Sequence, residues 1–254
     1  MTDAHQHRRV VWLGHATVVI DLDGTKLLTD PVLRPRIAHL RRSWAADPHA
    51  LRGVDAVLVS HVHFDHLDLP SLEKLERSVP VVVPRGAGGL LRRRRFEHVL
   101  EVAAGEELRI GAVTVVATEA EHDADRGPLG TKAPSLGYLV RGSRSVYFAG
   151  DTDLFGGMAE ICPGLDLALL PIAGWGPKTG PGHLDPRRAA EALRLLRPQT
   201  CVPVHWGTYH PLNWNAARRV AMELAPEELR RAAAELVPEV RIEVLERNGT
   251  LDLG

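Results

Sequence analysis

Three histidines and an aspartate stand within six residues in the first third of the chain. His61, His63, Asp65 and His66 follow directly after the apolar run 55–60. Imidazole and carboxylate groups are ligands that zinc, iron and manganese accept. In an extended backbone alternate side chains point the same way, so the first three share one face and His66 turns toward a second position. The alternative is a histidine-rich surface loop, and the density of ligand types argues against it. We therefore predict a metal site with room for two adjacent ions.

Further ligand types stand at the ends of later apolar runs. His122 comes after 113–118, Asp151 directly after 146–150, and His205 directly after 201–204. A single residue of this kind is normally a solvated loop residue. Three of them, in a chain that already carries the first motif, favour one shared metal site.

The elements that must position these residues follow from the hydrophobic pattern. Apolar and β-branched runs predict strands over 10–13, 17–22, 26–29, 54–60, 79–83, near 99 and 108, and over 113–118, 136–140, 145–149, 166–170, 200–204 and 240–246. Helices are predicted over 69–77, 87–95, 185–196 and 216–236, the last with a break at Pro226. Asp23-Gly24 predicts a hairpin turn, and Asp185-Pro186 a helix start. Strands alternating with helices, in an order that occurs twice, indicate two packed sheets with helices outside.

Composition bounds the class of protein. A chain of 254 residues with 44% hydrophobic and 25% charged residues can bury one large core, and we expect a single domain over 1–254. The net charge of −1 gives no global field that would attract nucleic acid. Two separated cysteines argue against a disulfide framework or a thiolate zinc site. We find no transmembrane span and no secretory core, and expect a cytoplasmic enzyme of unknown oligomeric state.

Several motifs resemble the metallo-β-lactamase superfamily. The spacing His-x-His-x-Asp-His at 61–66 is its signature, and His122, Asp151 and His205 follow in the expected order. Five flanking motifs are similar to the group that contains L-ascorbate-6-phosphate lactonase and N-acyl-phosphatidylethanolamine-hydrolysing phospholipase D. They lie at residues 12–17, 27–31, 147–152, 182–186 and 205–208.

This resemblance implies a fold and a ligand set. The fold is α/β, an αββα sandwich of two mixed β-sheets flanked by helices, with a dinuclear centre at one edge. By position, one metal would be held by His61, His63 and His122. The other would be held by Asp65, His66 and His205, and Asp151 would bridge the two. The cofactors are expected to be two divalent metal ions, Zn²⁺ in the first place, with Mn²⁺ or Fe as alternatives.

The expected activity is hydrolysis of a small or lipid-like ester, either a lactone or a phosphodiester. A hydroxide bridging two cations about 3.5–4 Å apart would attack the carbonyl carbon or the phosphorus. Asp65 could also orient this nucleophile, which makes it a candidate catalytic residue. Two alternatives stay open: a phosphodiesterase for nucleotides or nucleic acid, and an iron-dependent redox enzyme on the same scaffold.

Other side chains have two interpretations each. His183, in a Gly/Pro-rich loop before a helix, is either a catalytic residue that protonates a leaving group or a loop histidine bonded to the helix terminus. Lys178 and Arg126 either bind a substrate phosphate or carboxylate, or are solvated. His15 and Asp30 are expected to fix the tautomer of a ligand histidine.

The sequence also indicates which binding partners to expect. Arg92, Arg93, Arg94 and Arg95 form a run that we interpret as a solvated helix face, so no nucleic acid is expected. His210 either lines the pocket or is exposed on the surface. Trp44, Trp175, Trp206 and Trp214 either line the pocket or pack in the core. The segment 37–44 could be a lid or a patch that faces a membrane, but its apolar content is too low to argue for insertion.

Overall fold

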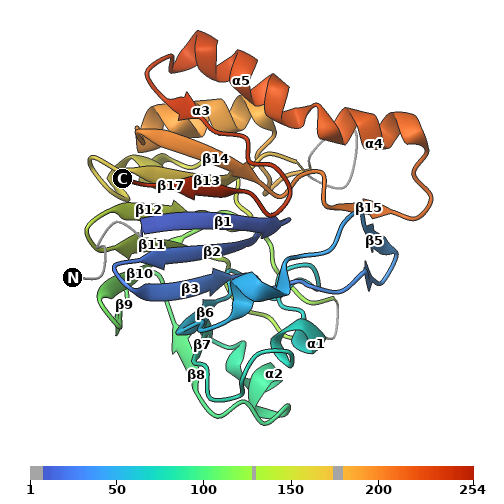
Figure 1. Cartoon of the computed structure of the whole chain (residues 1–254), viewed down its shortest axis with the longest axis vertical. Helices are drawn as coiled ribbons and strands as arrows, with labels where there is room; N and C mark the ends of the chain where they lie inside the picture. Colours follow the sequence, from blue (N-terminus) through green and yellow to red (C-terminus); the bar gives the residue numbers. More distant parts are fainter. Residues whose placement is uncertain (1–7, 128–129, 174–179) are drawn as a thin grey trace.

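Two seven-stranded β-sheets lie face to face, with helices on their outer faces (Figure 1). The computed structural model describes residues 8–127, 130–173 and 180–254. Lys178 and Trp175, which the sequence analysis named, lie outside these residues.

The first sheet has the strand order β17-β1-β2-β3-β6-β7-β8. Its strands are β1 (Arg8–Gly14), β2 (Thr17–Leu22), β3 (Thr25–Thr29), β6 (Ala56–Leu58), β7 (Val81–Pro84), β8 (Val99–Val102) and β17 (Thr250–Asp252). The pairs from β17 to β3 are antiparallel and those from β3 to β8 are parallel. Asp23 and Gly24 both have positive φ, 53° and 79°, as a two-residue hairpin turn of the primed type requires, so the predicted hairpin is confirmed.

The second sheet repeats this mixture in the order β16-β14-β13-β12-β11-β10-β9. Its strands are β9 (Glu107–Ile110), β10 (Val113–Glu119), β11 (Leu136–Arg141), β12 (Ser145–Phe148), β13 (Leu167–Pro171), β14 (Thr200–Val204) and β16 (Arg241–Ile242). The strands from β9 to β12 pair antiparallel, and those from β12 to β16 pair parallel.

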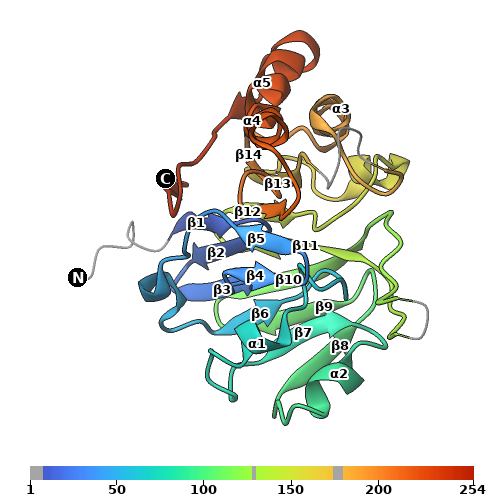
Figure 2. The same cartoon turned by 90° about the vertical axis from the view of Figure 1, so that its right-hand side faces the viewer.

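One hydrophobic core lies between the sheets, and each sheet has a second core under its helices. Ile20 and Leu58 of the first sheet and Tyr138 and Leu169 of the second belong to the central core. The helices are α1 (Leu69–Leu72), α2 (Gly88–Arg92), α3 (Pro186–Leu196), α4 (Ala216–Glu223) and α5 (Ala225–Leu236), with short 3-10 helices at Pro48–Leu51 and Gly156–Glu160. Helices α1 and α2 cover the first sheet, and α3 and α5 cover the second (Figure 2). The predicted αββα sandwich is confirmed.

A small third sheet was not predicted. It consists of β4 (Arg36–Ile37), β5 (Leu40–Arg42) and β15 (Tyr209–Pro211), in the order β15-β5-β4. Strands of two or three residues are too short to show a hydrophobic period, and the two segments that pair lie far apart in the sequence. In Figure 1 this sheet stands beneath α4, at one end of the sandwich.

Three of the predicted elements differ from the structure by at least three residues at one end. The helix predicted over 69–77 stops at Leu72, because the chain continues with bonds between residues three apart, such as Lys74 N–H to the Ser71 carbonyl at 3.1 Å. The helix predicted over 87–95 is limited to 88–92, and Arg95 turns the chain with a φ of 63°. The strand predicted over 240–246 is limited to 241–242, since the chain leaves the second sheet and joins β1 as β17.

The candidate ligands gather at one edge of the sandwich. His61, Asp151 and His205 come after the carboxyl ends of β6, β12 and β14, which all lie in the parallel parts of their sheets. Loops at the carboxyl ends of parallel strands meet at the same edge, where open α/β sheets commonly bind ligands. The fold therefore brings the strand-end residues to the first motif.

Candidate metal centre

His61, His63 and His122 form the first group of ligand atoms. His63 Nδ1 lies 3.1 Å from His61 Nε2 and 3.2 Å from His122 Nε2. Two nitrogen ligands of a tetrahedral zinc ion, each about 2.0–2.1 Å from it, are about 3.3 Å apart. The three nitrogens therefore have the spacing of three ligands of one ion.

His66, His205, Asp65 and Asp151 form the second group. Oδ2 of Asp151 lies 3.2 Å from His66 Nε2 and 3.3 Å from His205 Nε2. Oδ2 of Asp65 lies 3.8 Å from each of the same two nitrogens. Two imidazoles thus face two carboxylates in a pocket where both histidines are fully buried.

Asp151 connects the two groups. Its carboxylate contacts both histidines of the second group, and it also forms a possible ligand set with His122 and His183. Asp151 Oδ1 and His66 Nε2 are buried without a hydrogen bond to any described residue. Leaving a polar atom buried and unbonded is costly. Because a cation would satisfy both atoms, the donor set fits a metal at this position.

The remaining nitrogens of three candidate ligand histidines are held by hydrogen bonds. His66 Nδ1 donates to Asp30 Oδ2 at 2.7 Å, His122 Nδ1 to the Gly182 carbonyl at 2.8 Å, and His205 Nδ1 to the Ala173 carbonyl at 2.8 Å. Each bond places the proton on Nδ1 and leaves the lone pair of Nε2 directed at the cluster.

His61 is held by a relay through a serine that the sequence analysis did not name. Ser60 Oγ donates to Asp30 Oδ2 at 2.5 Å, so it accepts from His61 Nδ1 at 3.0 Å. Asp30 therefore holds two of the candidate ligand histidines, His66 directly and His61 through Ser60. In the sequence, only the position of Ser60 directly before His61 pointed to this role. That position does not distinguish a serine that links two side chains by hydrogen bonds from an ordinary buried serine.

The electrostatics differ between the two groups. Burial lowers the pKa of His61 well below its ordinary value and that of His122 to about 4, so both imidazoles are neutral, the form that binds metals. Burial acts against protonation of His66 too, but Asp151 and Asp65 hold the pKa of His66 well above its ordinary value. The two carboxylates of the second group thus attract positive charge, which a bound cation would also supply.

His15 lies against two of the candidate ligands, Asp65 and His205. Its Nε2 lies 3.3 Å from Asp65 Oδ2, and burial lowers the pKa of His15 to about 3. A neutral imidazole at this position contacts a candidate carboxylate ligand, and its ring centroid also lies 3.9 Å from that of His205. The backbone is held with a φ of 55° and donates from His15 N–H to Thr208 Oγ1 at 2.7 Å.

His183 lies on the solvent side of the cluster. Its Nε2 is 3.6 Å from Asp151 Oδ2, its ring centroid is 4.7 Å from that of His122, and its side chain is partly exposed. The following helix, α3, is capped by Asp185, whose carboxylate accepts from Arg188 N–H at 2.8 Å. The N-terminus of α3 is therefore capped by Asp185 and not by His183.

Arg126 is neither a free substrate ligand nor simply solvated. Its Nη1 donates to the carbonyls of Val62, at 2.7 Å, and Leu67, at 3.0 Å. The Phe64 ring centroid lies 4.0 Å from its guanidinium carbon. The loop after His122 is thereby tied to both ends of the segment that carries His63, Asp65 and His66.

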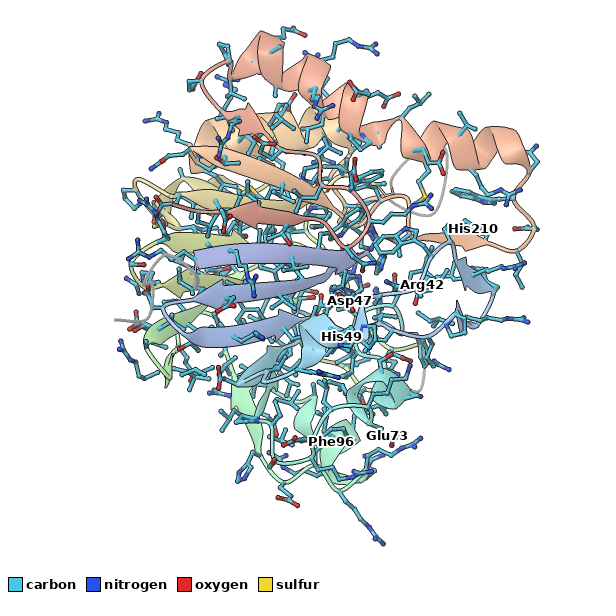
Figure 3. The ribbon with its side chains drawn as sticks, in the orientation of Figure 1. Arg42, Asp47, His49, Glu73, Phe96 and His210 are labelled. Atoms are coloured by element: carbon cyan, nitrogen blue, oxygen red, sulfur yellow. The ribbon has the colours of Figure 1, made fainter. Side chains whose placement is uncertain are left out.

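Two of the tryptophans and His210 have defined places in the fold. Trp44 and Trp206 pack against Trp12, with ring centroids 5.5 and 5.0 Å from it, next to the central core. His210 lies on β15, and Figure 3 shows it below α4.

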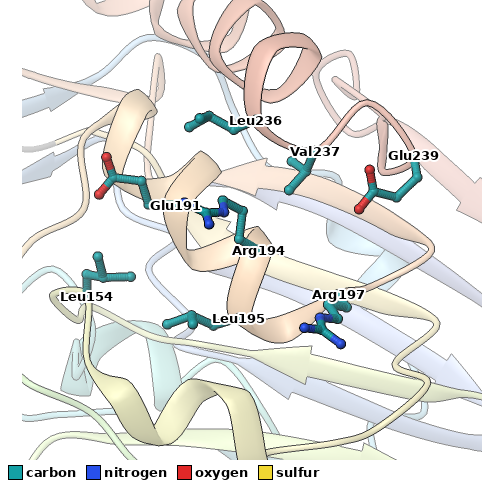
Figure 4. Close-up of a pocket in the computed structure, with 8 residues that line it drawn as sticks. All are labelled: Leu154, Glu191, Arg194, Leu195, Arg197, Leu236, Val237 and Glu239. Atoms are coloured by element: carbon teal, nitrogen blue, oxygen red, sulfur yellow. The ribbon is translucent and has the colours of Figure 1, made fainter.

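A separate pocket of about 710 Å³ opens beside α3 (Figure 4). It contains none of the candidate metal ligands. Its walls are Leu154, Glu191, Arg194, Leu195, Arg197, Leu236, Val237 and Glu239.

Comparisons with known proteins identify the family of this chain. The family described as "Beta-lactamase superfamily domain" matches residues 25–206. A UPF0173 metal-dependent hydrolase of Methanopyrus kandleri is 31% identical over 252 residues, which cover 94% of this chain and 96% of that protein. N-acyl-phosphatidylethanolamine-hydrolyzing phospholipase D 1 of Caenorhabditis elegans is 31% identical over 226 residues, which cover 78% of this chain and 63% of that longer protein.

Solved structures show the same fold. Igni18, a metallo hydrolase of Ignicoccus hospitalis, has a TM-score of 0.73 at 22% identity, covering 96% of this chain and 97% of its own. CmlA, a diiron β-hydroxylase of Streptomyces venezuelae, has a TM-score of 0.72 at 24% identity, covering 97% of this chain and 54% of its own. The chain therefore belongs to the metallo-β-lactamase superfamily and is a metal-dependent hydrolase of that fold.

Proposed function

We propose that this protein uses two divalent metal ions, with Zn²⁺ as the first choice, to hydrolyse a lipid-like or small ester, either a phosphodiester or a lactone. The observation that carries the proposal is that six other candidate ligand side chains gather around Asp151, whose Oδ1 is buried without a hydrogen bond to a described residue. One ion would be held by His61, His63 and His122. The other would be held by Asp65, His66 and His205, with Asp151 shared between them.

When bound, such an ion pair lowers the pKa of a shared water to about 7 and stabilises the charge that develops on the substrate. The protein's own groups do the rest. Asp65, which contacts His15, His66 and His205, would orient the attacking water. His183, on the solvent side, would give a proton to the leaving oxygen.

The relatives support this choice of substrate class. The C. elegans relative is named for cleavage of an N-acyl phosphatidylethanolamine, a lipid phosphodiester. The M. kandleri relative is named only as a metal-dependent hydrolase. Because the chain spans 63% of the phospholipase's length, a lipid substrate for this protein is part of the proposal.

The test is metal analysis of the purified protein followed by assays of the metal-loaded protein. The substrates are bis-p-nitrophenyl phosphate, an N-acyl phosphatidylethanolamine and a set of lactones. Asp65→Ala and His66→Ala should each lose metal and at least about 100-fold of activity, since both remove a ligand. His49→Ala, which changes an exposed histidine, is the matched control.

Four outcomes contradict parts of the proposal. Full activity without metal loss in Asp65→Ala would remove the ligand assignment. Iron with oxygen consumption and no ester hydrolysis would favour redox chemistry. Turnover of nucleotide phosphodiesters alone would favour a nucleotide phosphodiesterase. Retention of both metal ions in His183→Asn with loss of kcat is the result expected for a proton donor, whereas an unchanged kcat would exclude that role.

A further inference from the structure

Two segments of this nearly neutral chain contain arginine and histidine but no carboxylate. Segments 31–46 and 208–222 together hold six arginines and two histidines, whereas the whole chain has 31 basic and 32 acidic residues. The tertiary structure joins these segments, because β15 pairs with β5 and β5 pairs with β4. The arginines stand at positions 34, 36, 41, 42, 218 and 219.

The register places a row of basic side chains on the outer face of the small sheet. Arg41 on the central strand is opposite Arg36 on one side and His210 on the other. The neighbours along each strand, including Ile37, Leu40 and Tyr209, are buried, so the basic side chains share the opposite face. Figure 3 shows His210 on this sheet, below α4.

Like charges directly opposite on neighbouring strands destabilise a sheet. In the described part of the chain, Arg36 Nε donates only to the Ala38 carbonyl, at 2.9 Å, and Arg36, Arg41 and Arg219 form no ion pair. Burial and the nearby charges of Arg219 and Arg41 lower the pKa of His210, whereas Glu223 raises it slightly. Because Arg219 and Glu223 belong to α4, this helix lies next to the row. The row is therefore a concentration of positive charge that the fold does not neutralise.

Exposed apolar side chains border this row. Leu212 follows β15 and is 48% exposed; Val220 and Leu224 of the α4 region are 52% and 50% exposed. Val220 and Leu224 are one helical turn apart, joined by the bond from Leu224 N–H to the Val220 carbonyl at 3.1 Å. Three of the five large apolar side chains exposed among the described residues thus lie at this one place.

The small sheet is also anchored to the candidate metal centre. Arg42, on its buried face, donates from Nη1 to the Val32 carbonyl and from Nη2 to the Leu13 carbonyl. Thr208, directly before β15, accepts from His15 N–H, and His15 contacts the candidate ligand Asp65. A surface that bound this sheet would therefore hold the metal centre nearby.

We propose that Arg36, Arg41, Leu212, Arg219, Val220 and Leu224 form a docking face for an anionic lipid bilayer, which we call the basic face. Cations attract anionic headgroups, and apolar side chains of this size enter the boundary between headgroups and acyl chains. Docking would bring a lipid ester to the metal centre. The delivery of a lipid ester rests on the proposed function, but the binding to the bilayer does not.

The test is sedimentation of the full metal-loaded protein with two kinds of vesicle. One contains phosphatidylcholine alone, and the other contains phosphatidylcholine and phosphatidylglycerol at about 3:1, which gives an anionic surface. Binding is expected only to the anionic vesicles, and it should decrease as salt increases. Arg36→Gln with Arg41→Gln should weaken binding about 30-fold, because each arginine near such a surface contributes about fivefold. Leu212→Gln with Val220→Gln should weaken it as well.

Matched controls separate docking from general charge and folding effects. Arg194→Gln with Arg197→Gln removes two exposed arginines beside the pocket of Figure 4, and Leu100→Gln removes an exposed leucine of β8; both should bind like the unchanged protein. All variants should keep their melting temperature, metal content and turnover of bis-p-nitrophenyl phosphate.

Several results would overturn the proposal. They are absence of binding to both vesicles, equal losses in the control variants, a dimer that the Leu212 and Val220 substitutions dissociate, or binding of RNA but not of vesicles through Arg36 and Arg41. Vesicle binding without hydrolysis of any ester would instead refute the proposed function and leave the docking face standing.

Discussion

Asp30 accepts a hydrogen bond from His66 Nδ1 at 2.7 Å, and both side chains are completely buried. The same carboxylate accepts from Ser60 N–H at 2.7 Å and from Ser60 Oγ at 2.5 Å. One aspartate at the end of β3 thus fixes the orientation of imidazoles that belong to two different groups of candidate ligands. Asp30 also forms a possible ligand set with His61 and His66, but its contacts with His66 and Ser60 favour an orienting role.

We expect Asp30→Asn to weaken metal binding about 10- to 100-fold, the usual cost of removing such a partner. The carboxylate accepts from Ser60 N–H at Oδ1 and from both His66 Nδ1 and Ser60 Oγ at Oδ2. An amide nitrogen in place of either oxygen is a donor, so at least one of these hydrogen bonds is lost. Titration with a metal-competing dye gives the affinity. Asp252→Asn, at an exposed position of β17, is the control, and an Asp30→Asn protein with unchanged affinity would exclude this role.

Metal removal should destabilise the whole fold. Ligand binding at 100 times the dissociation constant contributes about 2.7 kcal/mol, which corresponds to about 5–10 °C in melting temperature for a chain of this length. The buried carboxylates Asp65 and Asp151 would also repel one another without a cation. Calorimetry before and after dialysis against a chelator measures the shift. Restoration by added Zn²⁺ is expected, and an unchanged melting temperature would contradict the fit of a metal to this cluster.

Arg126→Gln should reduce metal affinity without unfolding the protein. The guanidinium ties the loop after His122 to the carbonyls of Val62 and Leu67, so its loss frees His122 relative to His61 and His63. The visible spectrum of the cobalt-substituted protein reports the ligand geometry independently of any substrate. We expect the spectrum to change in Arg126→Gln and to be partly restored in Arg126→Lys.

The control for this experiment is Arg93→Gln, which changes an exposed arginine at the end of α2. Its spectrum should equal that of the unchanged protein. A normal cobalt spectrum in Arg126→Gln, together with an increased KM, would show instead that Arg126 binds substrate.

The two cysteines should differ in reactivity. Burial raises the pKa of the Cys201 thiol to about 12, whereas Cys162 is partly exposed. At about pH 8 a thiol with a pKa near 12 is ionised in roughly one molecule in 10⁴, and only the thiolate attacks a disulfide reagent. An aromatic disulfide should therefore modify one thiol in the folded protein and both after unfolding. Rapid modification of a folded Cys162→Ser variant would contradict this expectation.

Much of the candidate site could be predicted from the sequence because its ligands follow strand ends. The apolar runs that become β6, β12 and β14 can be recognised in the sequence. His61, Asp151 and His205 come directly after those runs. Ligands within one loop, such as His63 and Asp65, require no tertiary information at all. The longer helices could also be predicted from the sequence. Helix α3 begins at the predicted cap, and α5 begins where Pro226 interrupts the helical pattern.

Other features depended on contacts between distant segments. The orienting carbonyls of Gly182 and Ala173 carry no side-chain signal, and the contact between His15 and Asp65 joins residues fifty positions apart. The third sheet exists only because β15 meets β5 across the chain. The sequence by itself determined which atoms could bind a metal, because ligand chemistry belongs to residue types. Only the tertiary structure decided which nitrogen of each histidine faces the cluster and which face collects unneutralised arginines, because both depend on long-range backbone pairing.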